Sequence, residues 1–75
     1  MSENILSEDT WTLIEPGLLQ MDTTNLCIRY DAAWGLFRVE HNGAPLASHN
    51  YHTLETAKRK TYHYARDMFE MGLPI

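Results

Sequence analysis

Residues 38–60 read RVEHNGAPLASHNYHTLETAKRK, and this stretch decides the fold. It runs from alternating apolar and polar residues through Asn42-Gly43 into a second alternating segment, and then into a helical pattern. Asn-Gly is the strongest short-range signal for a two-residue hairpin turn, because both central residues of a type I′ turn need positive φ angles. The stretch therefore predicts an antiparallel hairpin that is followed at once by a helix.

The helix is predicted to start after Thr53, whose hydroxyl can accept a hydrogen bond from an unpaired amide of the first turn. Its apolar stripe follows the three- and four-residue spacing of one helix face. The stripe consists of Leu54, Ala57, Thr61, Tyr64, Ala65, Met68 and, at its end, Met71. Gly72 can adopt the left-handed conformation that closes a helix, and Pro74 prevents continuation, so we expect the helix to end there.

Upstream, the alternating segments 26–30 and 36–41 are typical of two paired strands. The segment 11–21 is interrupted by Pro16-Gly17 and is interpreted as two short strands or one broken strand. The strand from Ala44 to His49 contains Pro45, which lacks an amide donor, so that strand starts late or lies at an edge. The predicted fold class is α+β: a small antiparallel three- to four-stranded β-meander with one C-terminal amphipathic helix packed on one face. The expected core comprises Ile28, Phe37, Val39, Leu54, Ala57, Tyr64, Ala65 and Met68.

The chain of 75 residues is expected to form a single domain, 1–75, with residues 1–10 as a frayed N-terminal segment. A chain this short buries only about 60% of its unfolded surface, so it commonly needs a disulfide, a metal or a partner. Cys27 has no second cysteine to pair with, and a lone thiol in a strand favours a reducing compartment. No targeting signal or membrane-length apolar run is present, and we expect a cytoplasmic protein.

The sequence offers no constellation for catalysis or for a cofactor. His49 and His52 form one close pair, whereas a zinc site needs four ligands, so no metal is expected. Cys27 lies between Leu26 and Ile28, which predicts a packed thiol rather than a reactive thiolate. Neither a Gly-x-Ser-x-Gly nor a phosphate-binding loop occurs. We therefore predict that the protein is not an enzyme.

The charge is unevenly distributed. The net charge is −4, and residues 1–22 contain acidic side chains but no Lys or Arg. Trp34 lies in a loop beside Gly35, as either a lid on the core or an exposed anchor for a partner. The first hypothesis is a small acidic protein-interaction module, such as phages and other mobile elements encode to inhibit or adapt a host nucleic-acid-handling machine (anti-CRISPR-like or anti-restriction-like). Its partner would be a host protein or a protein–nucleic-acid complex. The candidate partner-binding residues are Trp34, Glu8, Asp9, Glu15 and Asp22.

The second hypothesis is a nucleic-acid-binding domain. Arg59, His63 and Arg66 are three or four residues apart, so they could share one helix face and follow a phosphate backbone, with Arg38 as a further candidate. The competing interpretation is a solvated outer helix face. A third hypothesis is a homo-oligomer, for example a homodimer, whose sheet edges pair in a structural role.

The run from Trp34 to Ala65 resembles known DNA-binding architectures. Trp34-Gly35 precedes a strand, and Thr53-x-Glu55-x-Ala57 opens a helix that carries Tyr62 and Ala65, as in plant AP2-type and integrase arm-binding domains. The resemblance covers less than half of the chain and implies DNA reading by the exposed face of a three-stranded sheet. This sequence departs from that pattern because its hairpin offers few basic groups besides Arg29 and Arg38.

Overall fold

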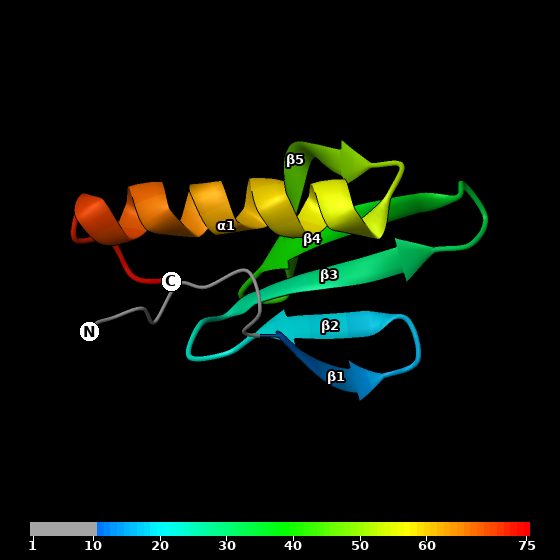
Figure 1. Cartoon of the computed structure of the whole chain (residues 1–75), viewed down its shortest axis with the longest axis horizontal. Helices are drawn as coiled ribbons and strands as arrows, with labels where there is room; N and C mark the ends of the chain where they lie inside the picture. The colour runs from blue at the N-terminus through cyan, green and yellow to red at the C-terminus, as the bar shows by residue number, and fades with distance from the viewer. Residues whose placement is uncertain (1–10) are drawn as a thin grey trace.

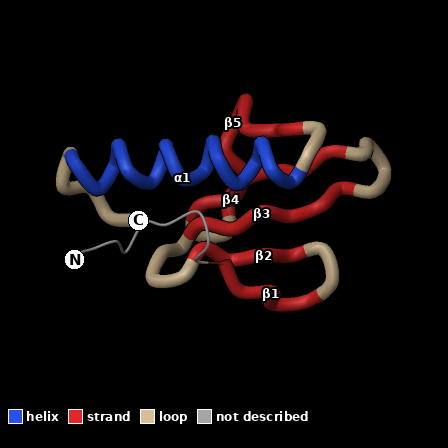
Figure 2. Tube along the Cα trace, in the orientation of Figure 1, coloured by secondary structure: helices blue, strands red, loops and turns tan. Residues whose placement is uncertain are grey.

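The structure is a computed structural model, and it describes residues 11–75. A five-stranded antiparallel sheet, in the order β1-β2-β3-β4-β5, carries one helix on one face (Figure 1). The elements are β1 Trp11–Glu15, β2 Leu18–Met21, β3 Leu26–Asp31, β4 Leu36–His41, β5 Ala44–Tyr51 and α1 Leu54–Glu70. Figure 2 shows the strands side by side in chain order, with the helix lying along the sheet. The predicted α+β meander with a C-terminal helix is confirmed.

The sheet has one strand more than the expected maximum of four. Pro16-Gly17 does not break a strand but turns the chain between two paired strands, with Glu15 opposite Leu18. Gly17 has a φ of 82°, a conformation that glycine adopts without steric cost. The predicted frayed segment 1–10, with the candidate residues Glu8 and Asp9, lies outside the described residues.

The turn between β4 and β5 follows the sequence prediction. Asn42 and Gly43 have φ angles of 57° and 81°, both positive as a type I′ turn requires. His41 is paired with Ala44 and Glu40 with Pro45. β5 is the outermost strand on its side of the sheet, which explains how it tolerates a proline.

Both predicted helix ends are confirmed. The Thr53 hydroxyl accepts a hydrogen bond from the Thr56 amide at 3.2 Å. At the other end Gly72 has a φ of 76°, and the Leu73 amide donates to the Met68 carbonyl at 2.9 Å. This is the six-to-one hydrogen bond of a Schellman motif. The backbone carbonyl of Ile75 then accepts from the Asn25 amide at 2.6 Å, which ties the end of the chain to the turn between β2 and β3.

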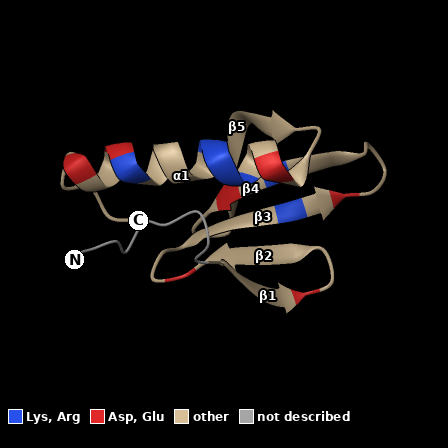
Figure 3. Ribbon diagram, in the orientation of Figure 1, with Lys and Arg blue, Asp and Glu red and all other residues tan. Residues whose placement is uncertain are grey.

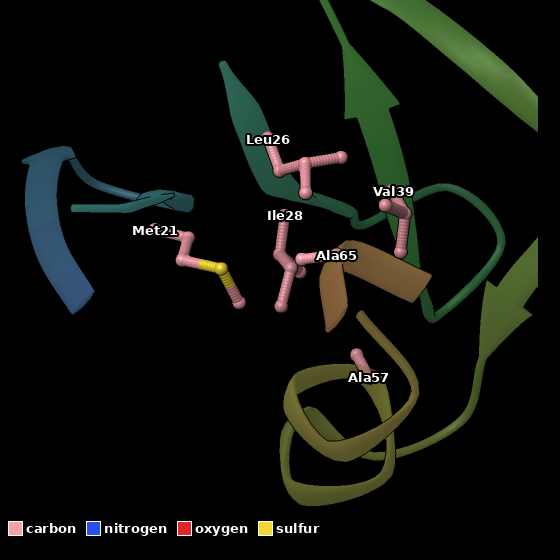
Figure 4. Close-up of a cluster of buried hydrophobic side chains, with 6 residues drawn as sticks. All are labelled: Met21, Leu26, Ile28, Val39, Ala57 and Ala65. Carbon is pink, nitrogen blue, oxygen red and sulfur yellow. The ribbon is translucent and has the colours of Figure 1, made fainter. Parts of the chain in front are cut away.

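The core lies between α1 and the middle of the sheet (Figure 4). Its buried apolar residues are Met21, Leu26, Ile28, Val39, Ala57 and Ala65. The prediction for Ile28, Val39, Ala57 and Ala65 is confirmed, whereas Phe37, Leu54, Tyr64 and Met68 are only half-buried. The helix presents small residues, Ala57, Thr61 and Ala65, to the sheet. Their size lets the helix backbone approach closely, so larger residues lie at the margins of the contact.

The helix covers only part of the sheet. Its backbone approaches β3, β4 and β5 and does not approach β1 or β2. A helix with its side chains is about 10 Å across and strands are about 4.8 Å apart, so one helix covers about two or three strands. α1 therefore does not cover the helix-side surface of the β1–β2 hairpin around Leu13, whereas Met21, at the other end of β2, is buried in the core (Figure 1).

Candidate functional site

An apolar groove lies where the helix stops covering the sheet. Its volume is about 260 Å³. The lining residues are Leu13, Gly17, Leu18, Leu19, Ile28, Tyr30, Phe37 and Leu54. None of them carries a charge, so the groove suits apolar groups.

The pairing register of the strands shows which residues form one side of this groove. Leu13 is paired with Leu19, Leu19 with Ile28, and Ile28 with Val39. Directly paired residues share a face of the sheet, so these four form one row across β1 to β4 on the helix side. Val39 is 0% exposed and Ile28 is 1% exposed, whereas Leu13 is 64% exposed. The row passes from core to open surface as it leaves the helix.

The end of the groove is built by aromatic residues and a turn. Tyr30 and Phe37 are paired across β3 and β4, and their ring centroids are 4.9 Å apart. The Tyr30 amide donates to the Gly17 carbonyl at 2.8 Å, which fixes the β1–β2 turn against β3. Leu54, in the first turn of α1, lines the same groove. Residues of β3, β4, the β1–β2 turn and α1 therefore meet at this end of the groove.

The opposite face of the sheet is polar, and its arginines are paired. Arg29 Nε lies 3.0 Å from Glu40 Oε2, and its Nη1 lies 3.9 Å from Glu15 Oε2. Arg38 donates from Nε to Asp31 Oδ2 at 2.8 Å, an interaction that lowers the pKa of the Asp31 carboxyl below its usual range. Three carboxylates thus neutralise two guanidinium groups. Among the described residues, 11–75, the positive charges of this face are therefore balanced, and they would not attract a phosphate backbone.

Cys27 lies on this polar face and is half-buried. Partial burial raises the pKa of its thiol, the negative charge of Glu40 raises it further, and Arg29 lowers it. A raised pKa keeps the thiol protonated near neutral pH, and the thiolate is the nucleophilic form. The local chemistry therefore disfavours Cys27 as a nucleophile, in agreement with the sequence interpretation.

The candidate partner-binding residues are spread over the molecule. Trp34 is 73% exposed in the β3–β4 turn, so it is not a lid on the core. In an antiparallel meander the β1–β2 and β3–β4 turns lie at the same end of the sheet, so Trp34 and Glu15 are both at the groove end (Figure 1). Asp22 lies in the turn between β2 and β3, at the other end, where it accepts a hydrogen bond from Thr12.

The residues of the nucleic-acid hypothesis are also not brought together. Arg59, His63 and Arg66 are exposed on α1, and Arg66 Nε lies 3.2 Å from Glu70 Oε2. Arg38 is adjacent to the buried Val39 in β4, so its side chain leaves the sheet on the face opposite the helix. Figure 3 shows basic bands on α1 with acidic bands near both of its ends. The helix surface therefore has mixed charge, with no basic surface continuing onto the sheet.

The groove was not predicted from the sequence, although its components carry signals. Leu13, Leu18 and Leu19 lie in the segment 11–21 that the sequence predicts to form strands, and the alternating pattern predicts Phe37 in the core. The available signal was the mismatch between one helix and a sheet of more than three strands, because a sheet that wide exceeds the width of one helix. Which strands remain uncovered depends on where the helix packs.

The chain matches no protein-family model, no curated protein and no solved structure. Within residues 11–75, the helix α1 is not long and apolar enough to cross a membrane, and no other helix is described. Over the same range, no three His, Cys, Asp or Glu side chains are grouped so that they could hold a metal ion.

Proposed function

We propose that this protein is a small non-enzymatic protein-interaction module that docks its partner in the apolar groove beside α1. The observation that carries the proposal is the exposed apolar surface of the groove beside α1, where Leu13 is 64% and Tyr30 44% exposed. Contiguous exposed apolar surface in a small protein marks interaction sites more often than isolated exposed residues do. Ile14, 51% exposed, is a second exposed apolar residue of β1, but it does not line the groove.

The chemistry of the groove favours an apolar anchor from a partner. Filling it removes apolar surface from water, which stabilises a complex by about 25 cal/mol for each Å² buried. Trp34, at the same end of the sheet, offers a large exposed indole, and Trp is enriched among the residues that dominate binding energy. The groove and Trp34 lie at the same end of the sheet, so one partner could contact both.

A narrower form of the proposal concerns the kind of target. The acidic N-terminal part of the chain would compete for a basic nucleic-acid channel in a host machine, as an inhibitor or adaptor encoded by a mobile element. The support for this form is the charge distribution: net charge −4, with no Lys or Arg in residues 1–22. The groove would then anchor the protein, and the acidic residues would steer it to its target.

The test is capture of partners from the lysate of an organism that encodes or encounters the protein, after nuclease treatment. Leu13→Lys places a charge in the groove, and Met71→Lys makes a comparable change at a 66% exposed apolar residue beyond the end of α1. We expect the parent and Met71→Lys to retain the same protein and Leu13→Lys to lose it. Loss of all bound protein on nuclease treatment, or equal retention by both variants, would contradict the proposal.

A further inference from the structure

We infer that the occupant of the groove is an extended, basic segment of the partner protein, which pairs with β1 as a sixth strand and inserts alternate apolar side chains into the groove. This inference rests on the proposed function and specifies its partner. It combines two features that the fold places side by side: the outer edge of β1, with which no strand of residues 11–75 pairs, and the groove that Leu13 lines.

The two edges of the sheet differ in how well they are protected. β5 contains Pro45, a residue with positive φ at Ser48 and a register irregularity against β4, all of which hinder pairing with another strand. β1 also has one register irregularity, between Leu13 and Glu15, and one charged residue, Glu15, but it has no proline and no residue with positive φ. Within residues 11–75, β1 is therefore the less protected of the two edges.

The register explains how backbone pairing and groove binding would act together. A strand added beside β1 continues the row that runs from Val39 through Ile28 and Leu19 to Leu13. The residue opposite Leu13 would lie on the helix side of the sheet, at the groove, and its neighbours two positions away would share that face. Main-chain hydrogen bonds then supply affinity, and the groove selects side chains, as in other cases of strand addition.

Charge complementarity decides between a foreign segment and a second copy of this chain. Residues 1–22 carry Glu3, Glu8, Asp9, Glu15 and Asp22 without a basic residue. Two copies paired through β1 would bring together two Glu15 side chains and two chains that each carry a net charge of −4. Like charges placed opposite one another on paired strands are destabilising. A segment that carries Lys or Arg converts this repulsion into attraction, so the foreign basic segment is favoured.

The experiment is selection of linear peptides from a random phage-displayed library on the immobilised full chain, with Leu13→Lys for counter-selection and Met71→Lys as the control. We expect enriched peptides to carry Lys or Arg and apolar residues at every second position. An enriched peptide is then synthesised in two forms, N-methylated either at its odd or at its even residues. Only alternate amides of an added strand face β1, so one form should lose binding and the other should retain it. Replacing the basic residues of the peptide by Gln should weaken binding.

Several outcomes would overturn the inference. They are the absence of any peptide whose binding depends on Leu13, equal binding of both N-methylated forms, or enrichment of peptides without basic residues. A dimer of the parent that Leu13→Lys dissociates, measured by light scattering, would assign the edge to a second copy. If protein capture depends on Leu13 but the peptides fail, only the strand-addition mode is wrong. If protein capture does not depend on Leu13, the proposed function itself is wrong.

Discussion

Tyr30 and Phe37 face each other across β3 and β4 with their ring centroids 4.9 Å apart, one step along the helix-side face from the buried pair Ile28 and Val39. The helix covers Ile28 and Val39 and leaves Tyr30 and Phe37 at the groove. The step from a covered pair to an open pair therefore marks the border between the core and the candidate docking surface.

This border predicts that truncating Ile28 and truncating Phe37 to alanine lower the free energy of unfolding by different amounts. Ile28→Ala should lower the free energy of unfolding by about 2–5 kcal/mol, because it leaves a cavity in the core. Phe37→Ala should cost less than the roughly 3–5 kcal/mol typical of a fully buried Phe, since Phe37 is only partly covered. Urea-induced unfolding of the two variants checks this prediction. If Phe37→Ala lowers the free energy of unfolding by the full amount typical of a buried Phe, the helix covers more of the sheet than the structure shows.

Thr61 predicts a stabilising substitution. Its side chain is 0% exposed, and its hydroxyl finds no hydrogen-bond partner within residues 11–75. Burying an unpaired hydroxyl costs about 1–3 kcal/mol, so Thr61→Val should raise the unfolding free energy by about 1 kcal/mol. Thr61→Ser, which keeps the hydroxyl and removes the methyl group, should lower it. Destabilisation by Thr61→Val would show that the hydroxyl has a partner.

The pair formed by Arg38 and Asp31 predicts a pH dependence. The pKa of Asp31 is lowered in the folded protein, first by the hydrogen bond from Arg38. Its stabilising contribution is therefore complete above the pKa of the unfolded chain, about 3.9, and is lost as the pH falls through the folded-state pKa. Asp31→Asn should lower the melting temperature near neutral pH, and the difference from the parent should shrink in strong acid. Asp67→Asn, on the exposed surface of α1, is the control, and a constant difference at all pH values would contradict the prediction.

The helix face predicts weak interaction with nucleic acids. Arg66 is paired with Glu70, and Arg38 lies on the other side of the sheet, so the basic residues of the nucleic-acid hypothesis do not form one surface. We expect no micromolar binding of duplex DNA, single-stranded DNA or RNA at low salt, and no effect of replacing Arg59, His63 and Arg66 by alanine. Binding that this variant abolishes and that weakens linearly with the logarithm of salt concentration would instead support the nucleic-acid hypothesis.

Local chemistry made much of the fold predictable. Asn42-Gly43 fixed the last hairpin, and Thr53 and Gly72 marked the helix ends, because turns and caps depend on a few adjacent residues. Pro16-Gly17 was ambiguous, since such a pair can interrupt one strand or connect two. Only the pairing of β1 with β2 resolves it.

The candidate site was less predictable because it depends on tertiary packing. The alternating pattern correctly placed Phe37 and Val39 on one face, but it could not show that Val39 is covered and Phe37 is at an opening. That difference follows from where Ala57 and Ala65 seat the helix on β3 to β5. For the same reason, the sequence allows Trp34 to be either a lid on the core or an exposed anchor, and only the packed structure shows that it is exposed.

Photo-crosslinking tests the central claim, that the uncovered groove binds a partner protein, most directly. A benzophenone side chain is placed at Tyr30, 44% exposed in the groove, or at Phe69, 54% exposed near the end of α1 as the control. Each protein is irradiated in nuclease-treated lysate, and crosslinked species are identified by mass spectrometry. We predict one abundant protein adduct from position 30 that disappears with Leu13→Lys, and none from position 69. Adducts from position 69 alone, or equal adducts from both positions, would contradict the account.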